Sequence, residues 1–156
     1  MNKYLKLIIC LAACFLAGGL GTIFTISAIP TWYIYLNKPF FSPPSWLFAP
    51  VWTTLYFLMG ISLWLIWKKG YNKKNKEAIN LFIIQLILNA VWTPIFFGLK
   101  NLGGGLVIII LLWYFIFKTI KAFGKLDKTA AYLLYPYLAW VSFATLLNLS
   151  VWLLNM

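Results

Sequence analysis

The sequence predicts an all-α integral membrane protein, a bundle of five membrane-spanning helices whose proline- and aromatic-rich first loop caps a pocket. Three observations support this fold class. Hydrophobic residues make up 63% of the chain and charged residues only 10%, whereas soluble domains carry roughly 25% charged residues. Five apolar segments each approach the roughly 20 residues that a helix needs to cross a bilayer. The lysines lie almost entirely between or beside these segments.

The five predicted spans form a single membrane domain over residues 1–156, and they cover about residues 5–29, 46–67, 78–97, 103–123 and 129–154. The first span follows Lys3 and Lys6 as a signal peptide would. Its apolar run is longer than the roughly 7–15 residues of a signal peptide, so we expect it to stay in the protein. Small residues of this span (Ala13, Ala17 and Gly21) allow close approach of a helix from a second copy or from the same bundle.

The loop between the first two spans is dense in proline and aromatic residues. Five of the seven prolines fall between residues 30 and 50: Pro30, Pro39, Pro43, Pro44 and Pro50. Because proline fixes its own backbone and restricts the residue before it, we expect a stiff, shaped loop. Its aromatic residues fit two interpretations, an aromatic belt at the membrane surface or a lid over a pocket.

Polar and aromatic residues recur at helical spacing inside three spans. They are Phe48, Trp52, Tyr56 and Met59 in the second, Gln85, Asn89 and Trp92 in the third, and Trp140, Ala144 and Leu147 with Asn148 in the fifth. The amides fit interhelical hydrogen bonds, the usual role of such side chains in membrane bundles. Counted from the first loop, Trp52 and Trp92 lie about 8–9 Å deep. The three sets can therefore also converge on an aromatic cavity with a few amide groups, suited to a flat, apolar ligand. Pro136 precedes the fifth set and is expected to kink that helix.

The lysines predict the topology. Eleven of the 13 fall at the N-terminus and around the second and fourth loops, which leaves Lys38 and Lys100 on the other side. By the positive-inside rule, the N-terminus is cytoplasmic and the C-terminus outside in a bacterial inner membrane. The same rule accounts for the net charge of +11, so we do not expect binding to nucleic acid.

The chain lacks the side chains that most enzymes use for catalysis. The chain has no histidine, one glutamate (Glu77) and one aspartate (Asp127). Nucleophile–histidine systems, carboxylate pairs and zinc sites cannot be assembled from this set, so we expect no metal and no required cofactor. Proton-coupled export is disfavoured because no acid lies in a span. Cys10 and Cys14 are expected to be buried thiols.

Three separated motifs resemble the TspO/MBR family, which comprises tryptophan-rich sensory proteins and the mitochondrial translocator protein. The first runs from Trp32-Tyr33 through Lys38-Pro39, Pro43-Pro44-Ser45-Trp46 and Pro50-Val51-Trp52 to Met59-Gly60. The second is the segment from Gln85 to Gly98, and the third runs from Tyr135-Pro136 through Trp140 to Asn148. The resemblance covers nearly the whole chain in the family's order.

The resemblance implies a five-helix membrane protein, usually a homodimer, with a pocket beneath the first loop for porphyrins and benzodiazepine-site ligands. It implies pocket positions at Trp32, Trp52, Asn89, Trp92, Trp140, Ala144 and Leu147, and positions near the mouth at Pro43, Phe48 and Ala49. The vertebrate cholesterol pattern is absent, since its tyrosine and basic positions are Leu149 and Leu153 here.

Two functions follow from the resemblance. The protein is expected to bind porphyrins, or another flat apolar molecule, in tetrapyrrole sensing or transport and stress response. The alternative is a catalyst of light-dependent porphyrin breakdown, in which Trp52 and Trp140 are the oxidisable residues against the ligand.

Overall fold

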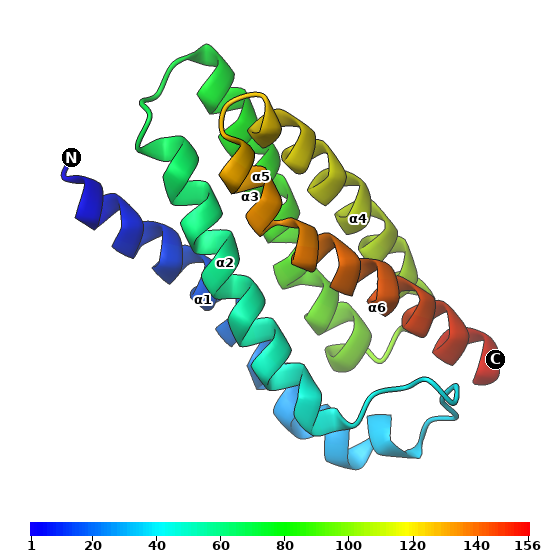
Figure 1. Cartoon of the computed structure of the whole chain (residues 1–156). Coiled ribbons are helices and arrows are strands. Elements are labelled where there is room, and N and C mark those ends of the chain that lie inside the picture. The colour runs from blue at the N-terminus through cyan, green and yellow to red at the C-terminus, as the bar shows by residue number, and fades with distance from the viewer.

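The computed structural model describes all 156 residues and contains only helices and the loops between them. Five long helices form the bundle (Figure 1): α1 (Lys3–Thr31), α2 (Phe48–Trp67), α3 (Lys73–Thr93), α4 (Leu102–Gly124) and α6 (Tyr135–Leu154). Short turns complete it: η1 (Tyr33–Tyr35), η2 (Ser45–Leu47), the π-helical turn η3 (Pro94–Gly98) and α5 (Lys128–Leu133). Five helical segments are long and apolar enough to cross a membrane, as predicted. The protein is an integral, multi-pass membrane protein.

The observed helix ends differ from the predicted ones in three places. The first loop is shifted by two residues toward the C-terminus, because α1 continues through Pro30 to Thr31 and α2 begins at Phe48, with Pro50 in its first turn. A proline in a first helical turn removes an N–H that has no partner there. The third span begins at Lys73, before the predicted residue 78, because Asn72 accepts a hydrogen bond from the Asn75 N–H and caps the helix. The expected kink near Pro136 is a break at Leu134, between α5 and α6.

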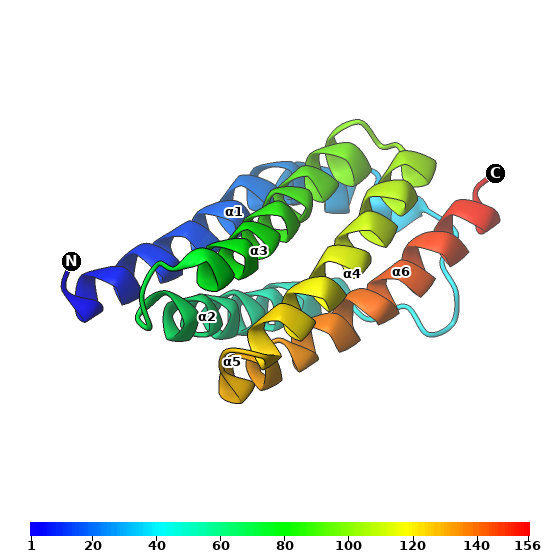
Figure 2. The ribbon, with the colours of Figure 1, turned by 90° about the horizontal axis from the view of Figure 1, so that it is seen from above.

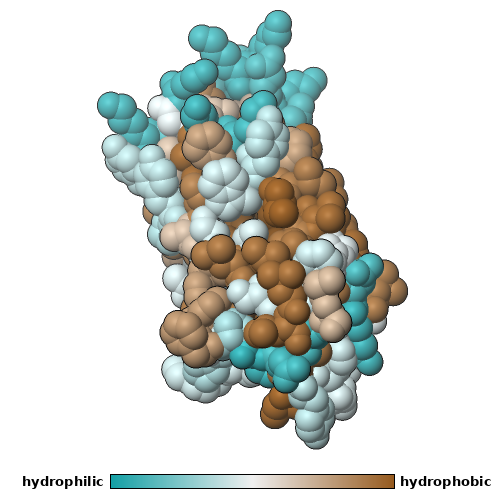
Figure 3. Space-filling model, turned by 90° about the vertical axis from the view of Figure 1, so that its right-hand side faces the viewer, coloured by the Kyte–Doolittle hydropathy of each residue, from teal (hydrophilic) through white to brown (hydrophobic).

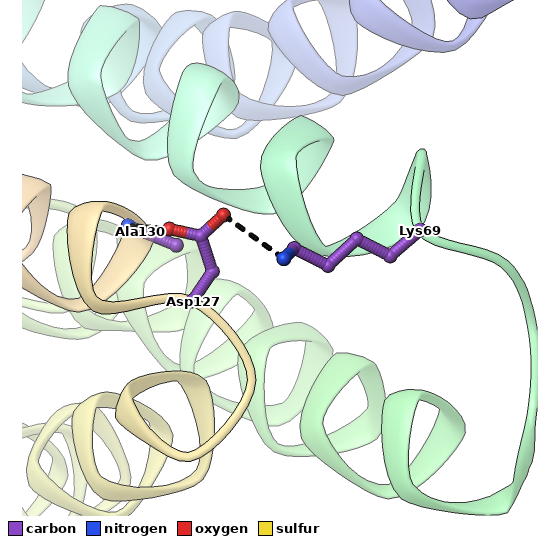
Figure 4. A network of polar contacts seen from close by, with 3 residues as sticks. All are labelled: Lys69, Asp127 and Ala130. Carbon is purple, nitrogen blue, oxygen red and sulfur yellow. Dashed lines mark hydrogen bonds and ion pairs between the residues drawn. The ribbon is translucent and has the colours of Figure 1, made fainter.

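The lysine-rich segments share one end of the bundle. The N-terminus and the α2–α3 and α4–α5 loops lie there, with the first loop and the C-terminus at the other end (Figure 1). Figure 3 shows this end as hydrophilic, above a hydrophobic band on the side of the molecule. Asp127 joins two of the basic loops: its side chain accepts a hydrogen bond from the Ala130 N–H at 3.1 Å and pairs with Lys69 at 3.5 Å (Figure 4).

The buried core fills the half of the bundle nearest the lysines. Phe82 of α3 and Phe123 of α4 stack there with ring centroids 5.9 Å apart, and both side chains are fully buried. Met59 of α2 joins the same core. Cys10 and Cys14 are buried free thiols at its α1 edge, as predicted. Because this half is filled, the space for a ligand lies in the half beneath the first loop.

Close contact between α1 and α2 depends on Gly60. A Cβ atom at Gly60 would lie 2.6 Å from Leu11 Cδ2 and 3.0 Å from Leu11 Cα, so the second helix has no room for a side chain. At Gly19 of α1, by contrast, a Cβ would meet nothing within 4 Å. The two glycines therefore separate the effect of helix packing from that of glycine's own low helix propensity.

We expect Gly60→Val to lower the free energy of unfolding by about 1–3 kcal/mol, since it forces the two backbones apart. Gly19→Ala is the matched control. It is expected to be neutral or to stabilise the helix by up to about 1 kcal/mol, because alanine is the better helix former. Denaturation of the two variants in one detergent measures both. Equal stability of Gly60→Val and wild type would contradict the packing described here.

Candidate ligand-binding site

A cavity of about 680 Å³ lies in the loop-side half of the bundle, among all five long helices, α1, α2, α3, α4 and α6. This volume falls within the roughly 300–1,000 Å³ typical of small-molecule pockets. Eight of the ten predicted site residues line it: Phe48, Ala49, Trp52, Asn89, Trp92, Trp140, Ala144 and Leu147. The structure thus brings together residues from three separate motifs of the sequence.

Trp32 and Pro43 are the two predicted site residues that the structure does not bring to the cavity surface. Trp32 follows the end of α1, and its ring packs edge-on against Phe96 and Phe97, at centroid distances of 5.9 and 6.3 Å. Both phenylalanines line the cavity, so Trp32 supports the wall from behind. Pro43 lies in the loop, half-buried and outside the lining.

The tryptophans present faces in two perpendicular directions. Trp52 stacks on Tyr56, with centroids 5.6 Å apart and planes at 26°. It meets Trp140 at 89°, with centroids 6.5 Å apart, and Phe48 meets Trp140 at 72°. Edge-to-face contacts of this kind hold the rings in fixed positions. The result is a rigid aromatic corner in which a flat ligand can stack on one ring and contact the edge of another.

The amides of the third span bind other helices. Tyr56 Oη donates to Asn89 Oδ1 at 2.8 Å, and Asn89 Nδ2 donates to Tyr137 Oη at 2.8 Å. Tyr137 Oη donates in turn to Gln85 Oε1 at 2.7 Å. The interhelical role of these amides is therefore confirmed in the structure, where Asn89 joins α2, α3 and α6. Asn89 lines the cavity but offers a ligand less than the sequence indicated, because its oxygen and one N–H already have partners.

A second pair of polar contacts holds α3, α6 and the start of α4 together. Trp92 Nε1 donates to Asn148 Oδ1 at 3.1 Å, and Asn148 Nδ2 donates to the Leu102 carbonyl at 2.9 Å. The indole N–H of Trp140 differs from that of Trp92, since it is buried without a hydrogen-bond partner. Buried donors are nearly always paired in folded proteins. The Trp140 N–H is thus a donor without a partner, and because its nitrogen is shielded from the cavity, a ligand's carbonyl or carboxylate reaches it only when the indole ring turns.

The first loop is fastened over the cavity. Asn155, after α6, accepts from the Asn37 backbone N–H at 3.0 Å and donates to the Asn37 carbonyl at 2.8 Å. Lys38 Nζ donates to the carbonyls at the end of η1, those of Tyr33 at 3.0 Å and Leu36 at 3.1 Å among them. Tyr33 lines the cavity from the loop side. The loop is therefore a lid, and Lys38 is bound to its backbone.

The sequence did not indicate that α1 forms one wall of the cavity. Eight of its residues line the cavity: Phe15, Gly18, Gly19, Gly21, Thr22, Thr25, Ile26 and Ile29. The small residues of α1 serve packing within the chain: a Cβ at Gly18 would overlap the Tyr56 ring, and one at Gly21 would lie 3.0 Å from Thr93 Oγ1. Small residues in a helix indicate that another helix packs closely against it, but not which helix or on which side. The sequence therefore held no signal that these residues border a cavity.

The sequence profile of the TspO/MBR family matches residues 10–153. The Tryptophan-rich protein TspO of Chlorobaculum tepidum is 45% identical, over 99% of each chain. The Translocator protein of Bos taurus is 41% identical over 88% of this chain and 82% of its own. The Tryptophan-rich sensory protein of Cereibacter sphaeroides is 37% identical over 93% and 88%. By motif, fold and overall similarity, the chain belongs to the TspO/MBR family.

Proposed function

We propose that this membrane protein of receptor or translocator type binds porphyrins and benzodiazepine-site ligands in the cavity beneath the first loop, in tetrapyrrole sensing or transport. The observation that carries the proposal is the aromatic corner of Trp52 and Trp140, with the unpartnered Trp140 N–H beside it. A porphyrin supplies what this site lacks: a flat apolar ring to stack on the indoles and carboxylates to accept from the N–H. With no histidine in the chain, stacking rather than an axial imidazole would hold the ring.

Titration with protoporphyrin IX tests the proposal. We expect saturable quenching of tryptophan fluorescence, because a bound ring would lie against at least two indoles. A benzodiazepine-site ligand of the isoquinoline carboxamide class should reverse the quenching by competing for the same cavity. Quenching that rises linearly with porphyrin and is not reversed by the competitor would show partition into detergent or lipid, and would contradict the proposal.

The alternative function, light-dependent breakdown of porphyrin, is favoured by one feature of the same site. Trp52 contacts both Trp140 and Tyr56, so three oxidisable rings that all line the cavity are in mutual contact through Trp52. Dioxygen would be the oxidant and the excited porphyrin the sensitiser. No acid or base is needed at the site, so the missing histidine does not weigh against this chemistry.

We expect illumination of the bound complex in air to bleach the porphyrin faster than in the Trp52→Phe/Trp140→Phe variant, which keeps aromatic walls but lacks indoles. The decay of the porphyrin absorption band measures this, at matched occupancy of the two proteins. A sample without dioxygen is the control. Equal decay in both proteins would leave binding as the function and exclude tryptophan-dependent breakdown.

The lysine distribution supports an orientation with the N-terminus in the cytoplasm and the C-terminus outside, in the inner membrane of a bacterial cell. In this orientation the cavity opens toward the outer half of the membrane. The homodimer that the resemblance implies stays a prediction. Ala17 and Gly21 are buried inside the chain, so a pairing surface would use other residues.

A further inference from the structure

The cavity wall is incomplete between α1 and α2. Six cavity-lining residues of these two helices are exposed: Phe15, Gly19, Thr22 and Ile26 on α1, and Ala49 and Thr53 on α2. Ile26 is 70% exposed. On each helix these residues are spaced by three or four positions, so each set forms one stripe. The gap between the two stripes is called the side window below.

The side window arises because α1 leaves α2 partway along its length. At the lysine end the two helices touch, at Leu11 with Gly60 and at Gly18 with Tyr56. Toward the first loop α1 packs instead against the third span: Gly21 against Thr93, and Phe24 against Gly98. Figure 2 shows this end of α1 beside α3. Gly19 lies twelve residues before the end of α1, or about 18 Å at 1.5 Å per residue, so the window reaches the middle of the membrane.

The rim of the side window carries no charged side chain, and its two hydroxyl groups are paired within their own helices. Thr22 Oγ1 donates to the Gly18 carbonyl at 3.1 Å, and Thr53 Oγ1 donates to the Ala49 carbonyl at 2.7 Å. Both hydroxyls are thus satisfied by their own helices. Gly19 has no side chain, and the space beside it is open. An apolar molecule can therefore cross this rim without breaking a hydrogen bond of the protein, and so without the cost of leaving a polar group unpaired.

Ser45 and Trp46 of η2 are exposed and also line the cavity at the loop side, but the loop itself is held by several contacts. Two hydrogen bonds join Asn37 to Asn155, and Lys38 Nζ binds the loop backbone. Phe41 of the loop packs on Phe143 of α6, with ring centroids 6.0 Å apart. Passage through the loop would break these contacts, whereas passage through the side window breaks none of them.

We propose that ligands move between the cavity and the loop-side leaflet of the bilayer through the side window, and not through the first loop. This inference rests on the proposed function, and it narrows the ligand class to planar ring systems that partition into the membrane, including those that, like protoporphyrin IX, carry carboxylates on one edge. Polar, water-borne forms of the same ring systems would be excluded because they do not reach the rim. The window is where access can be blocked without altering the aromatic corner.

The test uses the full-length protein in phosphatidylcholine vesicles. Stopped-flow mixing with protoporphyrin IX gives the association rate, and displacement by excess isoquinoline carboxamide gives the release rate. The variants Gly19→Phe and Thr53→Phe place a ring at opposite sides of the window. Ile110→Phe, which adds a ring on the exposed side of α4 outside the cavity lining, is the control, and Asn155→Ala loosens the loop.

Each phenylalanine variant is expected to slow association and release together, by at least about tenfold, with little change in Kd, as a narrowed gate does. Ile110→Phe and Asn155→Ala should keep wild-type rates. The side window would not be the ligand's path if both phenylalanine variants kept wild-type rates, or if they lost affinity without slower release. Faster exchange in Asn155→Ala would likewise show that ligands pass through the first loop. Absence of saturable binding in the wild type would instead remove the proposed function itself, and the inference with it.

Discussion

Porphyrin binding should be nearly abolished when Trp52 and Trp140 are both replaced by alanine. The two rings meet at 89° with centroids 6.5 Å apart, and both line the cavity. A buried aromatic side chain at the centre of a binding site commonly contributes about 2 kcal/mol or more. Loss of two such contacts, about 4 kcal/mol in total, weakens Kd roughly a thousandfold. Fluorescence or absorbance titration of protoporphyrin IX measures the change.

Two controls make this result specific. Trp113→Ala removes an indole from the outer side of α4, where Trp113 Nε1 donates to Ser142 Oγ at 2.7 Å and the ring lies outside the cavity lining. It should leave binding unchanged. The Trp52→Phe/Trp140→Phe variant keeps the stacking surfaces and should bind with most of the wild-type affinity. The remaining loss would come from the missing hydrogen bond of the Trp140 N–H. Wild-type affinity in the double alanine variant would place the porphyrin elsewhere on the protein.

Replacing Asn89 by leucine should destabilise the fold by about 2–3 kcal/mol. The substitution removes the acceptor of Tyr56 Oη and the donor to Tyr137 Oη, both at 2.8 Å, between three helices. Interhelical hydrogen bonds in membranes contribute about 0.6–1.7 kcal/mol each, and a hydroxyl left without a partner adds a further cost. The effect is measured by unfolding the protein in detergent, with the loss of tryptophan fluorescence as the signal.

The variant Asn89→Leu/Tyr56→Phe distinguishes lost hydrogen bonds from a change of shape. It removes the hydroxyl that Asn89→Leu leaves unpaired, so it should be more stable than Asn89→Leu alone. Tyr56→Phe by itself should be destabilising, because Asn89 Oδ1 then loses its donor. If Asn89→Leu were as stable as wild type, the network would have no part in holding the helices together.

The fold was predictable because its signals are averages over long segments. Five apolar runs and the lysines between them define the spans whatever the packing of single residues. Local capping and breaking were less predictable: the cap at Asn72 moves a helix start into a lysine-rich segment, and Leu134 interrupts the last span before Pro136. Pro30 was misplaced in the loop because a proline in the last turn of a helix can be accommodated there.

The site was predictable where large side chains repeat at helical spacing. Trp52, Asn89 and Trp140 lie on three different spans, and their stripes meet at the cavity as the depth argument required. The wall from α1 was not predictable, since Gly19 and Thr22 border the cavity through the space they leave free. Trp32 is the converse case, a large aromatic residue of the motif whose ring supports Phe96 from behind. The angle and position at which helices cross decide which surface a side chain faces, and a single sequence does not specify how the helices cross.

A structure of the protein with bound protoporphyrin IX is the most direct test of the central claim. We expect density for the macrocycle beneath the first loop, against Trp52 and Trp140, with an acceptor atom of the ligand at hydrogen-bond distance from Trp140 Nε1. Density on the outer, lipid-facing surface, with the aromatic corner empty, would contradict it.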